Sequence, residues 1–206
     1  MGTTTQPWRV VGIDVGYSNL ATVVCDVDRT TFAITPVFGK MVDLRNLTCN
    51  DKNCMFEQGD RKAGHLVHHY VELMHEWFNT ADQIIIEAQP ICSSHKDVEQ
   101  LILVYCKQRY SIPKNKPIDH VKLLHPQSMH SHFSMSSKKA TRREEIVDIT
   151  RNYIQEFEAY RRSIQKDHLG DAMGYILYYT HTLMPDVMHS LKPNIFKKFS
   201  FNEQDL

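Results

Sequence analysis

Two short apolar segments, each with an acidic residue near its end, constrain the fold of this chain more than any other feature. RVVGIDV (9–15) contains Asp14, and QIIIEAQP (83–90) contains Glu87. Apolar runs of this length are typical of strands that are buried on both faces. Because neither acid has a Lys or Arg beside it in the sequence, each buried carboxylate needs a partner from elsewhere in the fold or a bound cation.

The hydrophobic periodicity of the whole chain predicts an α/β domain. The expected strands are 9–15, 20–27, 31–38, 83–90 and 120–125, and the expected helices are 63–78, 95–109, one that starts with the capping box Thr141 to Glu144, and 165–179. An irregular loop is expected over 40–60. This order predicts a mixed five-stranded sheet, an antiparallel meander followed by parallel strands, with helices on both faces.

The length of 206 residues suits one compact domain. We expect this domain to cover residues 9–185, between an N-terminal tail (1–8) and a basic and aromatic C-terminal tail (186–206). The sequence has no apolar run of membrane-spanning length and no secretory signal. A soluble, intracellular protein is therefore expected.

The two strand-end acids are expected to meet. If the helix over 63–78 connects their strands as a crossover, the strands are parallel and adjacent, so Asp14 and Glu87 emerge at the same edge of the sheet. Open α/β sheets place their chemistry at this edge. The sequence therefore predicts a functional site there.

The last predicted helix can bring further ligands to the same edge. In QKDHLGDAMGYILYY (165–179), Asp167 and His168 lie four and three residues before Asp171, so the three side chains share one stripe of the helix. The glycines of this helix are expected to let it approach the sheet closely, and its aromatic residues, Tyr175 included, are expected to be core. Three or four hard ligands with open positions suit Mg²⁺ and are typical of two-metal phosphodiester hydrolysis.

The motifs VVGIDVGYSNLATVV, IIIEAQP and DHLGDAMGY, in this order, resemble the RuvC-type Holliday junction resolvases of the retroviral-integrase, or ribonuclease H-like, superfamily. The likeness covers roughly residues 8 to 185. It is greatest to the resolvases of large DNA viruses, the poxvirus and iridovirus group, in which a Gln-Pro pair follows the strand-end acid as Gln89 and Pro90 follow Glu87 here. The segments LLHPQSMHSHF and KKATRREE also resemble the iridovirus-type enzymes.

This resemblance implies a ribonuclease H-like fold and a divalent-metal-dependent endonuclease. It also implies that the enzyme acts as a homodimer. This homodimer would cut two opposed strands of a four-way DNA junction, in DNA recombination or viral genome processing. Asp14 and Glu87 match the first two family acids, and His168 and Asp171 match the last pair, where the family usually has two acids. His168 then either binds the second metal or orients the attacking water, with Asp167 as an alternate ligand. Histidine is a softer ligand, so Mn²⁺ is expected to be tolerated beside Mg²⁺.

Basic residues are distributed unevenly. The chain has 24 basic and 24 acidic residues, yet residues 107–143 contain nine Lys or Arg and a single acid, Asp119. A neutral chain can thus present one basic face to a phosphate backbone, although a solvated surface without a ligand is the alternative. The expected DNA-binding residues are Lys138, Lys139, Arg142 and Arg143 at the start of a helix, with Lys114 and Lys116 as weaker candidates.

One group of residues has the composition of a zinc ligand set. It consists of Cys49 and Cys54 with His65 and His68 or His69. The two cysteines are loosely spaced and the histidines are expected to begin a helix, so no structural zinc is expected. The other three cysteines are expected to pack in apolar surroundings.

Three other functions compete with a junction resolvase. GIDVGYSN also resembles the first phosphate loop of the actin and sugar-kinase superfamily, whose members bind ATP, but those proteins need two domains and a second Gly-rich loop. A non-catalytic DNA-binding module would not need three acids that repel phosphate in the absence of a metal. A broader nuclease for flaps and other branched DNA stays open, because one sequence does not fix the shape of the substrate.

Overall fold

The computed structural model describes residues 6–47, 62–117, 119–162 and 166–186. Its centre is a five-stranded sheet with the strand order β3-β2-β1-β4-β5. The strands are β1 (Trp8–Asp14), β2 (Leu20–Val27), β3 (Ile34–Val42), β4 (Gln83–Glu87) and β5 (Val121–Leu124). The pairs β1–β2 and β2–β3 are antiparallel, and the pairs β1–β4 and β4–β5 are parallel. The predicted mixed sheet is confirmed.

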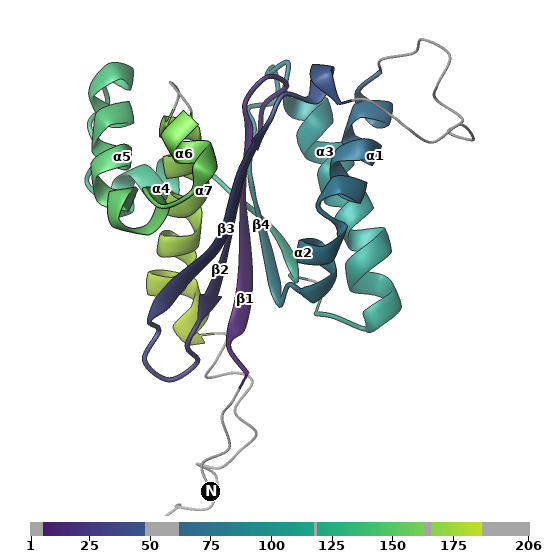
Figure 1. Cartoon of the computed structure of the whole chain (residues 1–206), viewed down its shortest axis with the longest axis horizontal. Helices are drawn as coiled ribbons and strands as arrows, with labels where there is room; N and C mark the ends of the chain where they lie inside the picture. The colour runs from purple at the N-terminus through teal and green to yellow at the C-terminus, as the bar shows by residue number, and fades with distance from the viewer. Residues whose placement is uncertain (1–5, 48–61, 118, 163–165, 187–206) are drawn as a thin grey trace, which may run out of the picture.

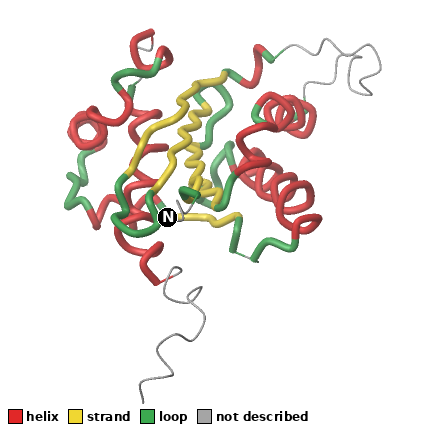
Figure 2. The backbone as a smooth tube through the Cα atoms, turned by 60° about the horizontal axis from the view of Figure 1, so that its bottom comes forward, coloured by secondary structure: helices red, strands yellow, loops and turns green. Residues whose placement is uncertain are grey.

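Helices cover both faces of this sheet, as predicted (Figures 1 and 2). One layer contains α1 (Ala63–Leu73), α2 (His75–Thr80) and α3 (Lys96–Cys106). The other contains α4 (Pro126–His132), α5 (Lys139–Ile154), α6 (Glu158–Arg162) and α7 (Asp167–Tyr178). None of the helices in the described ranges is long and apolar enough to cross a membrane.

The alternation of side chains along β1 decides which residues face which layer. Val11 and Ile13 belong to the hydrophobic core shared with α1, α2 and α3. Val10 belongs to the core shared with α7, and Gly12 lies directly against α7. Because side chains alternate with a period of two, Asp14 points to the face covered by α7.

Glu87 reaches the same place through the parallel register of β1 and β4. Ile13 pairs with Ile86, so the next residues, Asp14 and Glu87, leave the sheet side by side at its carboxyl edge. Ile85 belongs to the core on the α7 side, so Glu87, two residues later, shares that face. The predicted meeting of the two acids is confirmed.

Close packing of α7 on the sheet depends on Gly12. A Cβ on Gly12 would lie 2.3 Å from the carbonyl oxygen of Ala172, so only glycine lets the helix backbone come this near. The expectation that the glycines of the helix have this role is wrong. A Cβ on Gly170 or Gly174 would instead meet Ile146 of α5, at 3.4 Å and 2.8 Å.

The third strand starts later than the predicted 31–38, because a turn precedes it. The Asp28 carboxylate accepts hydrogen bonds from the backbone N–H groups of Thr30 (2.8 Å) and Thr31 (2.7 Å), and Phe32 has a φ of 58°. Side-chain bonds of this kind favour a turn over a strand. β3 then continues into the start of the segment predicted as a loop, most of which lies outside the described residues.

Helix boundaries also differ from the prediction. The expected helix over 63–78 is divided into α1 and α2, and the short helices α4 and α6 were not predicted. Thr141 does not cap α5, which begins two residues earlier after Lys138. The acid that bonds to the segment before the helix is Glu145, and not Glu144 of the predicted capping box. The Glu145 carboxylate accepts a hydrogen bond of 2.7 Å from the backbone N–H of Ser136.

Of the three cysteines expected to pack, Cys25 and Cys106 are buried as predicted. Cys92 is exposed, because it lies in the loop that leaves the sheet after β4. The C-terminal tail falls outside the part of the chain that the structure describes, apart from Asp186.

Candidate active site

A cleft of about 420 Å³ opens at the carboxyl edge of the parallel strands, where α7 begins. Its lining brings together the residues that the sequence placed in the site. These are Asp14, Glu87, Asp167, His168 and Asp171. They come from β1, β4 and the first two turns of α7, so three elements that are distant in sequence contribute to one site (Figure 1).

Asp14 and His168 form the central contact of the cleft. His168 Nδ1 lies 2.6 Å from Asp14 Oδ2, and the Asp14 side chain is almost fully buried. An ionised carboxylate can only accept, so Nδ1 then donates the hydrogen bond. The second ring nitrogen, Nε2, keeps its lone pair in this tautomer and can take a proton.

Glu87 is held at the end of β4 by backbone and side-chain donors. Its Oε2 accepts hydrogen bonds from the Val15 backbone N–H (3.2 Å) and from Gln89 Nε2 (2.6 Å). The hydroxyl of Tyr175, which lies on α7, is near enough to lower the pKa of this carboxylate. These two hydrogen bonds define the orientation of Glu87.

The three central acids have pKa values far above the ordinary range. Burial raises the pKa of Asp14 to about 8, with a further rise from the charges of Asp171 and Asp167 that a hydrogen bond to Glu87 partly offsets. Burial, followed by the charge of Asp14, raises the pKa of Glu87 to about 9. Burial, followed by the charge of Glu87, raises the pKa of Asp171 to about 7. Ionising all three together is therefore costly without a cation between them.

Asp167 differs from the other acids because it has a cationic partner. Its Oδ2 lies 2.9 Å from Arg143 Nε of α5. In this arrangement His168 contacts Asp14, and the buried Asp167 forms an ion pair with Arg143, while the choice between His168 and Asp167 as a metal ligand stays a prediction.

The donor chemistry of the cleft fits a divalent cation. Asp14, Glu87 and Asp171 are hard oxygen ligands that lack a Lys or Arg ion pair among the described residues, and bound metal would offset their mutual repulsion. Within those residues, however, no three His, Cys, Asp or Glu side chains already have the arrangement of a metal site. Ligation therefore requires some of these side chains to reorient toward the metal.

Basic residues form one wall of the cleft. Lys139, Arg142 and Arg143 of α5 line it, facing the acids of α7 and the sheet. The charge of Arg142 lowers the pKa of Asp171, which shows that the two groups are close. Lys138, the fourth residue expected in this group, precedes the first turn of α5 and is not part of the lining.

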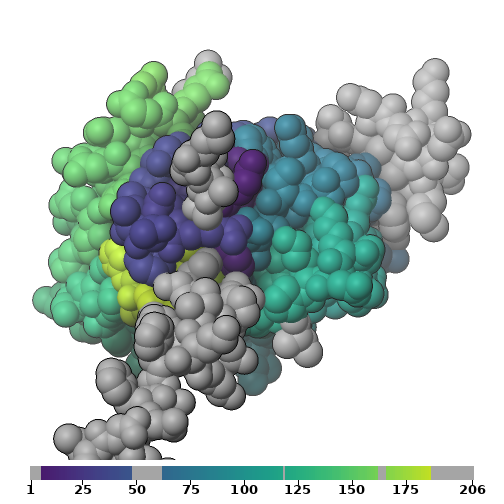
Figure 3. Space-filling view, turned by 90° about the horizontal axis from the view of Figure 1, so that it is seen from below, coloured from purple at the N-terminus to yellow at the C-terminus, as the bar shows by residue number. Residues whose placement is uncertain are grey.

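Lys114 and Lys116 lie elsewhere. Lys114 Nζ donates a hydrogen bond of 2.7 Å to Asn79 Oδ1, and Lys116 Nζ lies 3.5 Å from Asp82 Oδ1. Asp82 directly precedes β4, so both lysines are at the sheet edge opposite the acids, the edge from which Figure 3 views the molecule.

Several residues of the site were missed by sequence reasoning. Tyr175 is buried, as expected for core, but it also lines the cleft, where it lowers the pKa of Glu87. Gln89 was noted only as part of the resemblance. Glu99 is completely buried, and it accepts hydrogen bonds from the Gln89 backbone N–H (2.5 Å) and from Lys96 Nζ (2.8 Å). A buried acid that anchors the loop after β4 has no signature in sequence, because it resembles any acid in the first turn of a helix.

The zinc set considered in the sequence can be placed only in part. Cys49 and Cys54 lie outside the described residues. His65 lies in the first turn of α1, as predicted, and His68 and His69 lie in its middle.

Solved structures of resolvases resemble this chain. The fowlpox virus resolvase, in complex with Holliday junction DNA, matches with a TM-score of 0.56 and 13% identity over 85% of this chain and 98% of that chain. The yeast mitochondrial Holliday junction resolvase Ydc2 matches with a TM-score of 0.61 and 18% identity over 96% and 89%. Thermus thermophilus RuvC matches with a TM-score of 0.51 and 16% identity over 84% and 95%. No protein-family model and no curated protein matches the sequence.

These likenesses show that the chain has the ribonuclease H-like fold of Holliday junction resolvases, which confirms the fold expected from the motifs. At 13 to 18% identity these likenesses show the fold alone and assign no role to Asp14, Glu87, His168 or Asp171.

Proposed function

We propose that this protein is a metal-dependent endonuclease that cuts opposed strands of four-way DNA junctions. One observation carries the proposal: Asp14, Glu87, His168 and Asp171 converge in a single cleft, on a fold shared with resolvases. Two of the similar structures, from fowlpox virus and Thermus thermophilus, are complexes with Holliday junction DNA.

Each residue of the cleft has a chemical task in this proposal. Asp14, Glu87 and Asp171 would hold divalent metal ions, Mg²⁺ or Mn²⁺. Bound there, such ions lower the pKa of a water and stabilise the charge that develops on the scissile phosphate. His168 orients the attacking water and accepts its proton at Nε2, while Asp14 fixes the imidazole ring through Nδ1. Gln89 and the backbone N–H of Val15 hold Glu87 in place.

The basic wall of the cleft gives the DNA its position. Lys139, Arg142 and Arg143 lie on the lining opposite the acids, where they can bind the phosphates beside the scissile one. Contacts of this kind set the register of the backbone and carry no sequence information. Lys138, next to this wall, is a further candidate for a phosphate contact.

A homodimer completes the proposal. Symmetric cutting of two opposed strands needs two sites, and each chain offers one acid cleft within its described residues. The runner-up is a broader nuclease for flaps and other branched DNA. The structural comparisons do not favour the ATP-binding alternative or a binding module without catalysis.

The experiment that tests the proposal incubates purified protein with end-labelled four-way junction, flap, duplex and single-stranded DNA, with Mg²⁺, Mn²⁺ or EDTA. Paired symmetric nicks in the junction alone, lost in EDTA and in Asp14→Asn, support a resolvase. Equal cutting of flaps changes the claim to a branched-DNA nuclease. Junction binding without any cutting in either metal contradicts the catalytic proposal, provided that the protein is folded by circular dichroism.

A further inference from the structure

A pair of histidines on α1 forms a second cluster of metal-ligating side chains, separate from the cleft. His65 Nε2 lies 2.7 Å from His69 Nε2, and the two rings are in edge contact with centroids 4.6 Å apart. The two residues are one helical turn apart, so a single rigid element holds both nitrogens. His68 adds an edge contact to His69, with centroids 5.4 Å apart.

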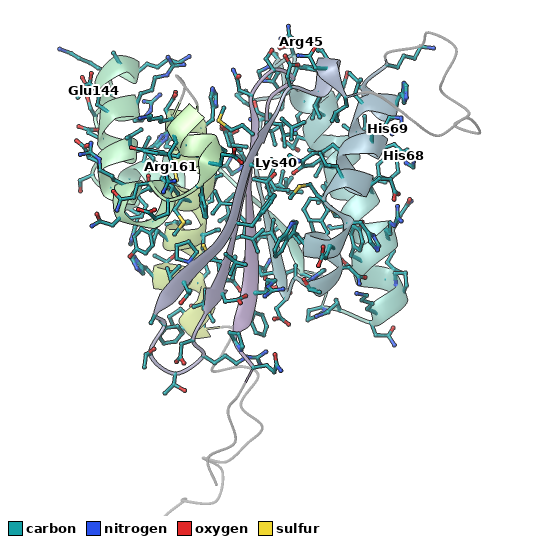
Figure 4. The ribbon with its side chains drawn as sticks, viewed as in Figure 1. Lys40, Arg45, His68, His69, Glu144 and Arg161 are labelled. Carbon is teal, nitrogen blue, oxygen red and sulfur yellow. The ribbon has the colours of Figure 1, made fainter. Side chains whose placement is uncertain are left out.

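The pair lies on the outer side of its helix. Leu66, Val67 and Tyr70 of α1 are buried, whereas His65 and His69 are half-buried. Figure 4 shows His69 on the side of α1 turned away from the sheet. The two Nε2 atoms face each other across a shared hydrogen bond, so a metal ion that takes the place of the shared proton has both nitrogens within reach.

We propose that His65 and His69 form a chelating site for a transition-metal ion, with Zn²⁺ as the first candidate. Imidazole nitrogen is a preferred ligand of zinc, and two histidines at positions i and i+4 of a helix are a recurrent ligand pair. Zinc bound at about 2.0 to 2.1 Å with tetrahedral angles separates two nitrogens by about 3.3 Å, so the pair must open by roughly 0.6 Å. Small rotations of the two imidazole side chains allow this change.

This site is independent of the proposed nuclease site. α1 packs on the face of the sheet that carries Val11 and Ile13, and α7 packs on the opposite face. The cleft offers hard carboxylates that suit Mg²⁺, whereas the α1 pair offers two softer nitrogens. The site is proposed from His65 and His69 alone, and zinc bound there stabilises the folded chain because the unfolded chain lacks the chelate geometry.

The test is isothermal titration of metal-free full-length protein with Zn²⁺, in excess Mg²⁺ so that the acids of the cleft are occupied. One saturable zinc site per chain is expected, with a zinc-dependent rise in melting temperature. His65→Gln and His69→Gln should each weaken zinc binding by about tenfold or more, because one ligand no longer chelates. His132→Gln, which removes an exposed histidine of α4 on the other face, should bind zinc like the wild type.

Three results overturn the proposal: no saturable zinc binding by the wild type, equal zinc affinity in all three histidine variants, or loss of the zinc site in Asp171→Asn. The last result would assign the zinc to the cleft. Circular dichroism and the melting temperature without metal confirm that each variant is folded. Zinc titration of the wild type at lower pH is a second measurement that needs no variant, because protons compete with the metal for imidazole nitrogen and zinc binding should weaken.

Discussion

Asp14 and His168 are 154 residues apart in the sequence, yet Oδ2 of the acid and Nδ1 of the histidine are 2.6 Å apart. One residue ends the first strand and the other lies in the first turn of the last α-helix. This pairing gives the imidazole one tautomer and one orientation when Asp14 is ionised, with Nε2 as the proton acceptor. The cleft therefore contains a candidate general base in addition to its three carboxylates.

Replacing His168 by Asn should abolish cleavage while junction binding stays within about twofold. Asn can still donate a hydrogen bond to Asp14, but it lacks a nitrogen that accepts a proton, and general-base catalysis contributes about 10²- to 10⁴-fold. Single-turnover cleavage and a gel-shift assay measure the two quantities. Cleavage by this variant within tenfold of the wild type would show that His168 is not the base.

Neutralising Asp171 should stabilise the metal-free protein at alkaline pH. The folded-state pKa of about 7 lies above the unfolded value of about 3.9, so Asp171 contributes stability that is lost as the pH rises from about 4 through 7. Asp171→Asn does not ionise, so in EDTA its melting temperature should exceed that of the wild type by roughly 3 to 8 °C at pH 8, and by less at pH 5.

Added Mg²⁺ should reverse this order at pH 8, because the wild type keeps all its ligands and the variant has lost one. Thermal denaturation followed by circular dichroism checks both parts. A variant that is less stable than the wild type in EDTA at pH 8 would contradict the repulsion among the three acids.

The strand-end acids could be predicted from sequence because the evidence for them is local. An apolar run that ends in an acid fixes Asp14 and Glu87 at strand ends, and the helix between the strands makes them neighbours. His168 and Asp171 follow from helical spacing. The four residues thus depend on periodicity and element order, which a sequence contains.

The remaining features depend on how elements pack. Gly12 could not be identified as the point of contact with α7, because nothing in a strand sequence shows which helix will cover it. Tyr175 is core by its spacing, and only the positions of β4 and α7 direct its hydroxyl to Glu87. The boundaries of β3 and α5 depended on side-chain bonds of Asp28 and Glu145, which compete with regular structure.

Gly12→Ala should destabilise the protein and disrupt the site together. The added methyl would lie 2.3 Å from the Ala172 carbonyl, so α7 must move away from β1. Overpacking of this kind costs about 1 to 3 kcal/mol. Because Asp171 precedes Ala172, cleavage should fall more than the loss of folded protein explains. Gly64→Ala is the matched control, since a Cβ there meets no atom within 4 Å and alanine favours a helix, so it should not lower stability and should leave cleavage unchanged.

Glu99→Gln should lower the rate of cleavage, although Glu99 itself does not contact the substrate in the proposed mechanism. Glu99 accepts hydrogen bonds from the Gln89 backbone and from Lys96, and Gln89 in turn holds Glu87. The neutral amide weakens the bond to Lys96, so the loop that carries Gln89 should shift and cleavage should fall about 10- to 100-fold, as for other outer-shell partners of metal ligands.

Junction affinity should change little in Glu99→Gln, which separates positioning from binding. Asp97→Asn, an exposed acid on the same helix, is the control and should cut DNA like the wild type. Equal loss of cleavage in both variants would indicate a general effect of charge on α3.

Removing the basic wall should weaken junction binding and reduce its dependence on salt. The double variant Lys139→Gln, Arg142→Gln loses two charges that line the cleft, so the slope of log K against log salt should fall by about 2. The measurement is fluorescence anisotropy of labelled junction, with Asp14→Asn as background so that the DNA stays intact. Lys114→Gln, Lys116→Gln, at the opposite edge, loses the same charge and should keep the wild-type slope. If both double variants lower the slope equally, the overall charge of the chain attracts the DNA, and the cleft wall has no special part in binding.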